Sequence, residues 1–426
     1  MTFENSLDFA TDLDAKDPLK NQRKQFIFPQ HHGKNVIYFT GNSLGLQPKQ
    51  TRNYIDEVLT DWGNLAVEGH FMAAKPWWDY HERFANQLSK VVGAKPSEIA
   101  VMNTLTVNLH LLMVSFYRPT KKRHKIICEE KAFPSDQYML ASQVRFHGYK
   151  PKDAIVQIKK RDGEHNFRTE DILKTIEEVG DECALILIGG VNYYTGQVFD
   201  MKTITAKAKQ KGAFVGWDLA HAVGNIALQL HDWDIDFASW CSYKYMNSGP
   251  GSVSGCFINE KYHNQKNIPR FEGWWGHSKE ERFLMAPEFI PEMNADAWQI
   301  SNAPILSLAP YLSSLQMFDE IGMDTIIIKR NLIVSYLEFI LNEVAKETNS
   351  KFEIITPSNP EERGTQLSVF LHGYGRKLFN YLMENGVFVD WREPNVIRLA
   401  PAPLYVSYTD VFNFGKILKN GILLIN

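Results

Sequence analysis

An aspartate and a lysine near the middle of the chain have the surroundings of a catalytic pair. Asp218 lies in the segment GWDLAH (216–221), directly after an apolar run. Lys244 lies in SYKY (242–245), after another apolar run and just before the turn-rich segment 247–251. A carboxylate and an amine at the ends of neighbouring strands could meet in the crevice where open α/β sheets bind their ligands.

This pair of residue types is typical of enzymes that use pyridoxal phosphate. The lysine amine forms a Schiff base with the aldehyde of the cofactor, and the aspartate keeps the pyridine nitrogen protonated. A protonated ring is the stronger acceptor of electrons from a carbanion next to the imine. An arbitrary Asp and Lys are more often solvated surface charges. Here the two tyrosines and the glycine-rich turn that flank Lys244 favour the catalytic interpretation.

Three further stretches could complete a site around this pair. Residues 103–108 (NTLTVN) precede a helical pattern, so their backbone N–H groups could hold a phosphate at a helix N-terminus. Phe133, in FPSD (133–136), could place an aromatic face against a cofactor ring. Arg398, near the end of an expected strand, could bind a carboxylate bidentately. Taken alone, each has a simpler explanation: an N-cap, a helix start with proline, and a surface arginine.

Three other patterns resemble sites without the context that those sites need. Residues 41–45 (GNSLG) match the G-x-S-x-G motif of serine hydrolases, with Ser43 as the nucleophile. They precede most of the expected sheet, and Pro48 delays the helix that should follow the serine at once. Residues 231–236 (HDWDID) resemble a metal-ligand cluster, but a turn before a strand is favoured. Residues 249–255 have the wrong glycine spacing for a dinucleotide-binding loop.

The elements that must position these residues alternate between apolar runs and amphipathic stretches. Strands are expected at 125–128, 154–158, 184–188, 213–217, 237–243 and 252–259. A helix at 200–211, with Asp200 as its N-cap and its end near Gly212, joins two of them. Strand, helix and strand in this order predict βαβ units and a mainly parallel sheet, and therefore an α/β fold.

The pattern changes near residue 305, which indicates a smaller α+β unit at the C-terminus. Helices are expected there at 325–347 and 376–384, and strands at 367–371 and 396–399. Before the large sheet, a short strand is expected at 35–39 and a helix after Pro48. The predicted division is an N-terminal arm and helix associated with the small domain (1–60), a large cofactor-binding domain (61–305) and a small C-terminal domain (306–426).

Bulk composition narrows the class of protein. The 426 residues are 44% hydrophobic and 22% charged, which is ordinary for a globular protein, and the net charge of −3 does not favour a nucleic-acid surface. The four cysteines form no C-x-x-C pair, which indicates free thiols in a reducing compartment. Since neither a signal peptide nor a membrane-spanning run is visible, we expect a cytoplasmic protein with no metal, membrane or nucleic-acid partner.

Nine short segments, in order along the chain, resemble the kynureninase family of fold-type-I pyridoxal-phosphate enzymes. They are YFTGNSLGLQPK (38–49), VMNTLTVNLHLL (101–112), FPSDQ (133–137), GVNYYTGQ (190–197), GWDLAHAVGN (216–225), WCSYKYMNSGPG (240–251), GWWGH (273–277), Ser301-Asn302 and IRLAPAPLY (397–405). Any one of them would be a weak match, but nine in family order over nearly the whole chain are highly specific.

The resemblance implies specific roles for residues of this chain. Lys244 would bond to the cofactor and Asp218 would contact its pyridine nitrogen. The other implied cofactor contacts are Leu105, Thr106, Phe133, Asp136, His221, Tyr243, Trp274 and Asn302. The implied substrate contacts are Ser43, His70, Ser301, Asn302 and Arg398. One position departs from the family: Gly189 stands where Ser or Thr is usual, so we expect either that one phosphate hydroxyl is missing or that another group takes its role.

The activity implied by the resemblance is hydrolysis of the Cβ–Cγ bond of L-kynurenine to anthranilate and L-alanine, and of 3-hydroxy-L-kynurenine to 3-hydroxyanthranilate and L-alanine. Lys244 would move the protons, and Tyr243 is the candidate donor to Cβ. His70 with Ser301-Asn302 resembles the pattern of enzymes that prefer the 3-hydroxy substrate. The family implies a homodimer with shared active sites, acting in the kynurenine pathway of tryptophan catabolism or in NAD biosynthesis.

Three alternatives remain at this point. The first is another fold-type-I activity, such as a cysteine desulfurase or an aminotransferase. A desulfurase would need a mobile catalytic cysteine in a loop, whereas the cysteines here lie mostly in strand-like runs. The second is a serine hydrolase built on Ser43, which would react with serine-directed phosphonates and bind no chromophore. The third is a non-catalytic binding protein that retains the fold.

Overall fold

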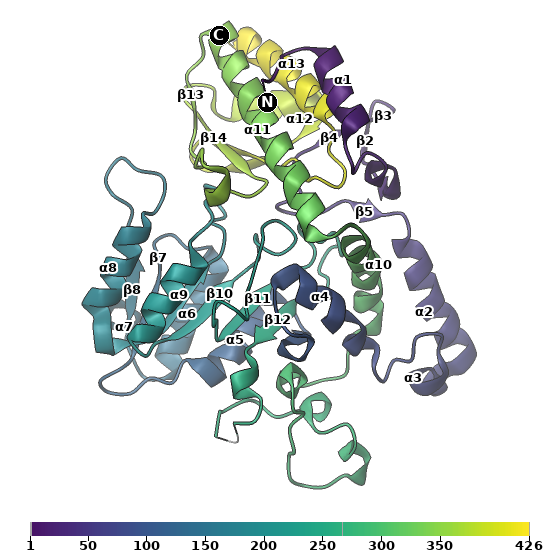
Figure 1. Ribbon diagram of the computed structural model, residues 1–426, viewed down its shortest axis with the longest axis vertical. Helices are drawn as coiled ribbons and strands as arrows, with labels where there is room; N and C mark the ends of the chain where they lie inside the picture. The colour runs from purple at the N-terminus through teal and green to yellow at the C-terminus, as the bar shows by residue number, and fades with distance from the viewer. Residues whose placement is uncertain (1, 266, 426) are drawn as a thin grey trace.

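The larger of two main sheets forms the lower part of the molecule in Figure 1, a computed structural model that describes residues 2–265 and 267–425. Its seven strands have the order β6-β12-β11-β10-β9-β7-β8. The strands β8, β7, β9, β10 and β11 pair in parallel, and β12 runs antiparallel to both of its neighbours. The predicted mainly parallel sheet is therefore confirmed. The strands are β6 (Ile99–Val101), β7 (Lys125–Glu129), β8 (Ile155–Ile158), β9 (Cys183–Gly189), β10 (Phe214–Asp218), β11 (Phe237–Trp240) and β12 (Gly255–Ile258).

Helices cover both faces of this sheet. Since successive side chains of a strand point to opposite faces, each strand packs against helices on both sides. In β9, Leu185 and Leu187 pack in the same buried cluster as α5 and α6, whereas Ile186 and Ile188 pack with α8 and α9. Burial on both faces explains why these strands are continuous apolar runs. The helices around the sheet are α4 (Ala85–Val92), α5 (Leu105–Phe116), α6 (Pro134–Phe146), α7 (Pro151–Ala154), α8 (Thr169–Val179) and α9 (Met201–Gln210).

The smaller sheet lies in the upper part of Figure 1 and is antiparallel, with the order β13-β14-β17-β16. Its strands are β13 (Phe352–Ile354), β14 (Leu367–Leu371), β16 (Asp390–Arg392) and β17 (Val396–Leu399). The helices beside it are α11 (Met323–Thr348), α12 (Gly375–Glu384) and α13 (Tyr408–Ile425). The two strands and two helices predicted after residue 305 are all present within one or two residues of their predicted limits.

The N-terminal segment lies against the elements of the smaller sheet. Helix α1 (Leu7–Lys16) packs on α13, and the short strand β4 (Ile37–Tyr38) pairs in parallel with β15 (Val387–Phe388). After α1, β5 (Gln47–Pro48) pairs with β1 (Phe26–Ile27), and β2 (Gln30–His31) with β3 (Lys34–Asn35). Helix α2 (Thr51–Leu65) instead packs along α10 (Ile305–Ile321). The limits of the three predicted domains stay predictions.

The strands on either side of Lys244 are shorter than predicted. Strand β11 ends at Trp240 and β12 begins at Gly255, so residues 241–254 form a loop. Within this loop, side-chain hydrogen bonds replace the hydrogen bonds of a sheet. Ser242 Oγ donates to the carbonyl of Val253 at 2.6 Å, and Ser248 Oγ donates to Ser242 Oγ at 2.6 Å. These bonds hold the lysine beyond the edge of the sheet.

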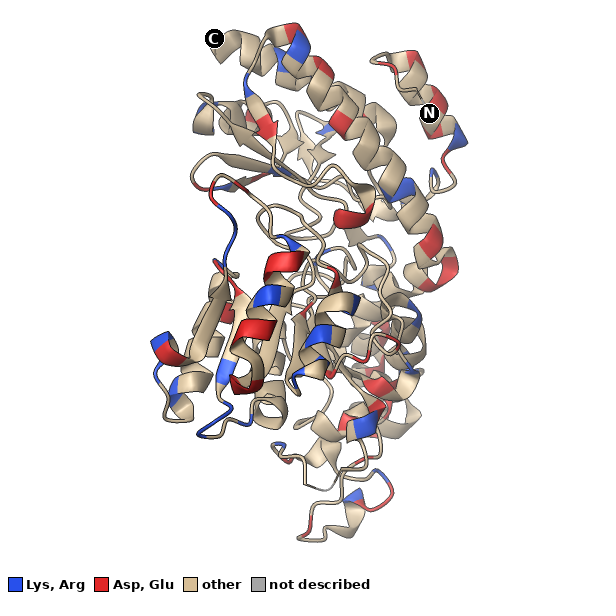
Figure 2. Cartoon of the chain, turned by 60° about the vertical axis from the view of Figure 1, so that its left-hand side comes forward, with Lys and Arg blue, Asp and Glu red and all other residues tan. Residues whose placement is uncertain are grey.

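The surface carries charges of both signs. In the view of Figure 2, basic and acidic residues are interspersed along the helices that face the viewer, and their numbers over the chain nearly balance, with a net charge of −3. Across residues 2–265 and 267–425, no helix is both long enough and apolar enough to cross a membrane.

Candidate active site

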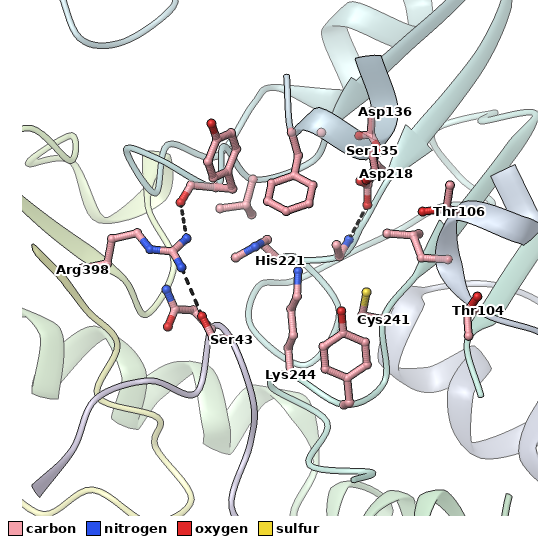
Figure 3. A pocket seen from close by; sticks show the side chains of 18 of the residues that line it. Ser43, Thr104, Thr106, Ser135, Asp136, Asp218, His221, Cys241, Lys244 and Arg398 are labelled. Atoms are coloured by element: carbon pink, nitrogen blue, oxygen red, sulfur yellow. Dashed lines mark hydrogen bonds between the residues drawn. The ribbon is translucent and has the colours of Figure 1, made fainter. Parts of the chain in front are cut away.

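A cavity of about 380 Å³ lies where β7, β9 and β10 end. The carboxyl ends of parallel strands are where α/β sheets bind ligands. Arg398, from the smaller sheet, closes the opposite side (Figure 3). Ten of the residues predicted for the site line this cavity: Ser43, Leu105, Thr106, Phe133, Asp136, Asp218, His221, Tyr243, Lys244 and Arg398.

Lys244 extends into the cavity from the loop 241–254 and forms none of the hydrogen bonds drawn in Figure 3. Its Nζ atom lies 5.9 Å from the centre of the Tyr243 ring. Gly45 packs directly against this loop, since its N–H donates to the Tyr243 carbonyl at 2.9 Å. A Cβ atom at position 45 would clash with the Lys244 carbonyl oxygen. The second glycine of GNSLG therefore permits a close approach to the lysine loop.

Asp218 is the last residue of β10 and lines the same cavity as Lys244. Its Oδ1 accepts the N–H of Ala220 at 2.7 Å. Asp136, from the first turn of α6, is hydrogen-bonded to it. Burial raises the pKa of Asp136 well above its ordinary value, and the charge of Asp218 and the hydrogen bond between the two carboxyls act in the same direction. Asp136 therefore keeps a proton beside Asp218 to a higher pH than an ordinary aspartate.

His221 and Tyr243 are held in their neutral forms. Burial lowers the pKa of His221 well below its ordinary value, and the positive charges of Lys244, Arg398 and Arg392 lower it further. Burial raises the pKa of Tyr243 above its ordinary value, with smaller contributions from Cys241 and Asp218. At neutral pH the cavity thus contains an uncharged imidazole and a phenol that can donate a hydrogen bond.

The N-terminus of α5 opens into the cavity and could hold an anion. Its N-cap residue, Thr104, makes no side-chain hydrogen bond to the helix, so the first N–H groups lack a partner within it. The helix dipole also favours a negative group at this position. Phe133 is 45% exposed, and its ring meets that of Tyr193 edge-on with the centroids 5.2 Å apart. A face of the Phe133 ring remains available for stacking.

Arg398 is 1% exposed and is held by the hydrogen bonds that it donates to several segments (Figure 3). Nη1 donates to the Tyr193 carbonyl at 2.6 Å and Nη2 to Ser43 Oγ at 3.1 Å. Asp390 on β16 forms ion pairs with Arg398 and with Arg392, the latter at 2.7 Å. The Ser43 hydroxyl donates to Asp390. A hydrolase nucleophile would instead donate to a general base such as histidine, so the geometry does not support that alternative.

Four predicted site residues lie outside the cavity of their own chain: His70, Trp274, Ser301 and Asn302. His70 is in the short helix α3 (Gly69–Met72), with Nδ1 3.0 Å from the Val67 carbonyl oxygen. Trp274 begins a 3-10 turn and is 38% exposed, and the residues at 301 and 302 are exposed just before α10. Within one chain, the structure does not bring these four residues to Lys244.

Several residues that line the cavity were not singled out from the sequence: Asn42, Glu129, Val191, Tyr193, Ala220, Cys241 and Arg392. A signal for Glu129 was available, because it directly follows the strand predicted at 125–128, as Asp218 follows its own strand. Gly189 lies between these two residues, and a Cβ atom there would meet the Glu129 carboxyl at 3.2 Å. A side chain at 189 would therefore crowd the Glu129 carboxyl, and the effect of Gly189 on phosphate binding stays a prediction.

The segment 231–236 has structural partners. His231 Nδ1 lies 2.9 Å from Glu98, and Asp236 pairs with Lys261 at 3.1 Å. Among the residues that the structure describes, no group of His, Cys, Asp and Glu has the arrangement of a metal site. The four cysteines are buried free thiols, as predicted.

Comparison with curated sequences gives full-length relatives. The model of the kynureninase C-terminal domain matches residues 330–418. A kynureninase of Christiangramia forsetii is 72% identical over 423 residues, which is 99% of this chain and 100% of that protein. One of Flavobacterium psychrophilum is likewise 72% identical, with the same coverage. One of Myxococcus xanthus is 51% identical over 418 residues, 98% of this chain and 97% of the relative.

Solved structures at low identity share the architecture. The apo cysteine desulfurase of Thermococcus onnurineus NA1 has a TM-score of 0.74 at 17% identity, covering 96% of this chain and 97% of the other. A C-DES variant with glycine covalently linked to its PLP cofactor has a TM-score of 0.75 at 14% identity, covering 90% and 96%. These likenesses confirm the predicted fold-type-I architecture. Because curated kynureninases match this chain closely over nearly its whole length, the chain belongs to the kynureninase family.

Proposed function

We propose that the chain is a kynureninase that uses pyridoxal phosphate bound around Lys244. It hydrolyses the Cβ–Cγ bond of L-kynurenine to anthranilate and L-alanine, and of 3-hydroxy-L-kynurenine to 3-hydroxyanthranilate and L-alanine. The observation that carries the proposal is the meeting of Lys244, Asp218 and Arg398 in one cavity of a chain with kynureninase relatives. We place the reaction in tryptophan catabolism or NAD biosynthesis, in the cytoplasm.

The residues of the cavity fit the cofactor. Its volume of about 380 Å³ falls in the range of small-molecule sites. The N-terminus of α5, with its unpartnered N–H groups at Leu105 and Thr106, suits the phosphate. Asp218 suits a protonated ring nitrogen, and the face of Phe133 suits the ring. When bound, pyridoxal phosphate condenses with an amino group and withdraws electrons from the bonds of the substrate's α-carbon.

Lys244 and Arg398 have different roles at the substrate's α-carbon. Arg398 binds the α-carboxylate through its guanidinium, which orients the α C–H bond. Lys244, with its amine free, would remove the α-proton. A positioned acid or base of this kind contributes roughly 100- to 10,000-fold in rate. Because His221 is neutral, it adds no positive charge that would make the lysine amine less basic.

Cleavage also requires a proton at Cβ once water has added to the γ-carbonyl. Tyr243 remains protonated at neutral pH because its pKa is raised by burial. It neighbours Lys244 in the sequence and lines the same cavity. We therefore assign Tyr243 as the donor to Cβ.

The visible spectrum of the purified protein and its products test this proposal. We expect a yellow absorption band that shifts when L-kynurenine or 3-hydroxy-L-kynurenine is added, with fluorescent anthranilate or 3-hydroxyanthranilate released. We also expect kcat/KM to be about tenfold or more higher for the 3-hydroxy substrate. Polar groups at His70 and 301–302 would be left without a partner by kynurenine, at a cost of about 1–3 kcal/mol each.

Other outcomes would contradict specific parts of the proposal. A yellow protein that forms neither product would indicate a different pyridoxal-phosphate activity, such as that of a desulfurase. A colourless protein that pyridoxal phosphate does not reconstitute would contradict the role of Lys244. A clear preference for unsubstituted kynurenine would contradict the roles given to His70 and 301–302.

We further propose that two copies of the chain form the working unit. The four site residues outside the cavity lie in segments that expose many apolar side chains, and such surfaces mark interfaces. Trp78 connects two of these segments, since its ring stacks on Phe283 at 5.0 Å and lies 5.9 Å from Phe71. The most exposed apolar residues there are Trp62, Val67, Phe71, Met72, Phe283, Leu284 and Met285. A second hollow, of about 340 Å³, borders α2 and the start of α10.

Mixing two impaired variants tests whether the sites are shared. Lys244→Ala removes the base, and Asn302→Ala removes a group proposed to reach the partner's cavity. If each site uses Lys244 of one chain and Asn302 of the other, a mixed dimer has one intact site. Random exchange of equal amounts should then restore about a quarter of the wild-type activity, since half of the dimers are mixed.

Light scattering and a purification tag on one variant show whether mixed dimers have formed. Mixed dimers that remain inactive would contradict the shared site, and a monomer in solution would contradict the dimer itself.

A further inference from the structure

Three adjacent strands of the large sheet end in one wall of the cavity. Strand β7 ends at Glu129, β9 at Gly189 and β10 at Asp218. Gly189 pairs with Asp218 in the register of the sheet and donates its N–H to Glu129 Oε1 at 3.2 Å. Asp136 faces the same wall from α6. Glu129 is thus a buried carboxyl group at the cavity that the proposed mechanism does not use.

The Glu129 carboxyl occupies space that a side chain at position 189 would need. A Cβ atom at Gly189 would lie 3.2 Å from Glu129 Oε1, closer than ordinary van der Waals contact. Glu129 is 5% exposed and lines the cavity. Oε1 accepts the Gly189 N–H, and among residues 2–265 and 267–425 no side chain donates a hydrogen bond to the Glu129 carboxyl.

The surroundings of Glu129 favour its protonated form. Burial raises the pKa of Glu129 to about 7, and the charge of Asp218 adds to this, while backbone hydrogen bonds act in the opposite direction. The titratable groups that face it are Asp218 from β10, Asp136 from α6, Tyr193 from the loop after β9 and Cys128 from its own strand. These groups are acids. Lys244, Arg392 and Arg398 line the same cavity, but none of them is among the groups that shift the pKa of Glu129.

Building on the proposed function, we infer that Glu129 is a positioning residue that carries a proton while the cavity holds the phosphorylated pyridine. The neutral carboxyl accepts the Gly189 N–H, which holds the end of β9 beside Asp218 without placing a second full charge there. A bound ligand excludes water from Glu129, and its protonated ring nitrogen pairs with Asp218, so the positive charge at this wall needs no second carboxylate. Loss of water disfavours ionisation, so ligand binding and protonation of Glu129 support each other.

Binding of pyridoxine 5′-phosphate to the apoprotein tests the inference without catalysis. This probe has an alcohol in place of the aldehyde, so it cannot condense with Lys244. Its Kd is measured by quenching of tryptophan fluorescence from about pH 6 to about pH 8.5, for the wild type and Glu129→Gln. A ligand that raises the pKa of Glu129 by about one unit binds about tenfold more weakly once the residue has ionised. We expect this additional loss of affinity in the wild type, and similar affinities of the two proteins near pH 6.

Thermal melting of the same apoproteins gives a second measurement. The pKa of Glu129 is about 4.5 in the unfolded chain, and burial raises it to about 7 in the folded chain. The folded form therefore loses stability as the pH rises through this window, and glutamine, which has no proton to lose, avoids that loss. The Tm of Glu129→Gln should rise relative to the wild type between about pH 4.5 and about pH 7, and the difference should then stay constant.

Glu130→Gln is the matched control. Glu130 is the next residue, lies outside the cavity and accepts the N–H of Lys160 at 2.9 Å. Its variant should show the wild-type pH dependence of Kd. Equal pH dependence of Kd in the wild type and Glu129→Gln, or a Tm difference that does not change with pH, would overturn the role of Glu129 alone. Failure of the wild type to bind the probe at any pH would overturn the proposed function and this inference with it.

Discussion

Replacing Lys244 by alanine is expected to abolish measurable cleavage of kynurenine while the protein remains folded. Lys244 is the proposed base at the α-carbon, and general acid–base catalysis alone contributes roughly 100- to 10,000-fold. The loss should fall on kcat. Because the Lys244 side chain forms none of the hydrogen bonds within the site, its removal should leave Tm nearly unchanged. The visible absorption that depends on covalent attachment to the lysine should also disappear, although the cofactor can still bind.

Lys202→Ala provides the control for this variant. Lys202 is an exposed residue of α9, far along the chain from the loop 241–254. It should keep the wild-type kcat, spectrum and Tm. A Lys244→Ala protein that retains more than about one hundredth of the wild-type kcat would contradict the assignment of Lys244 as the base.

Replacing Arg398 by lysine is expected to lower kcat/KM for kynurenine by about 10- to 100-fold, mainly through KM. Lysine keeps the positive charge but lacks the planar fork that binds a carboxylate through two hydrogen bonds. Hydrogen bonds to charged groups contribute about 1.5–3 kcal/mol, which corresponds to this range. Lysine is preferable to alanine here, because alanine would remove one of the two ion pairs of Asp390 and lower the stability of the fold.

Kynuramine, which is kynurenine without its α-carboxylate, separates a binding defect from a general one. The wild type should bind kynurenine more tightly than kynuramine, and Arg398→Lys should lose most of this difference while its affinity for kynuramine stays the same. Arg376→Lys, an exposed ion-pair partner of Glu393, should behave as the wild type. Equal losses for the two ligands would show that Arg398 supports the fold of the site without contacting the carboxylate.

Most of the large sheet could be predicted from the sequence because its signals are local. Strands buried on both faces must be apolar at every position, so β7, β9 and β10 stand out as continuous runs. The cap of α9 is also local, since Asp200 accepts the N–H of Thr203 three residues later. Helix α10 was missed for a related reason: it is apolar on several sides, without a clear helical period, and contains Pro310, which ordinarily argues against a helix.

The residues of the candidate site also differ in how far the sequence alone reveals them. Asp218 and Lys244 could be recognised from the sequence because each follows an apolar run at a strand end and neighbours further polar residues. Glu129 occupies an equivalent position, but its importance depends on Gly189, which is 60 residues away in the chain. The four residues outside the cavity were named by resemblance to the family, and their place in a working site depends on a second copy of the chain.

The sequence by itself determined the class of fold, the family resemblance and the residue types available for the chemistry, because these depend on patterns within a few residues. Only the tertiary structure decided which of these residues meet. Ser43 and Arg398 are 355 residues apart yet share a hydrogen bond, and Asp390 joins them from a neighbouring strand. The hydrogen bond from Arg398 to the Tyr193 carbonyl, in the loop after β9, joins the smaller sheet to the cavity. Local sequence cannot encode a contact whose partners lie hundreds of residues apart.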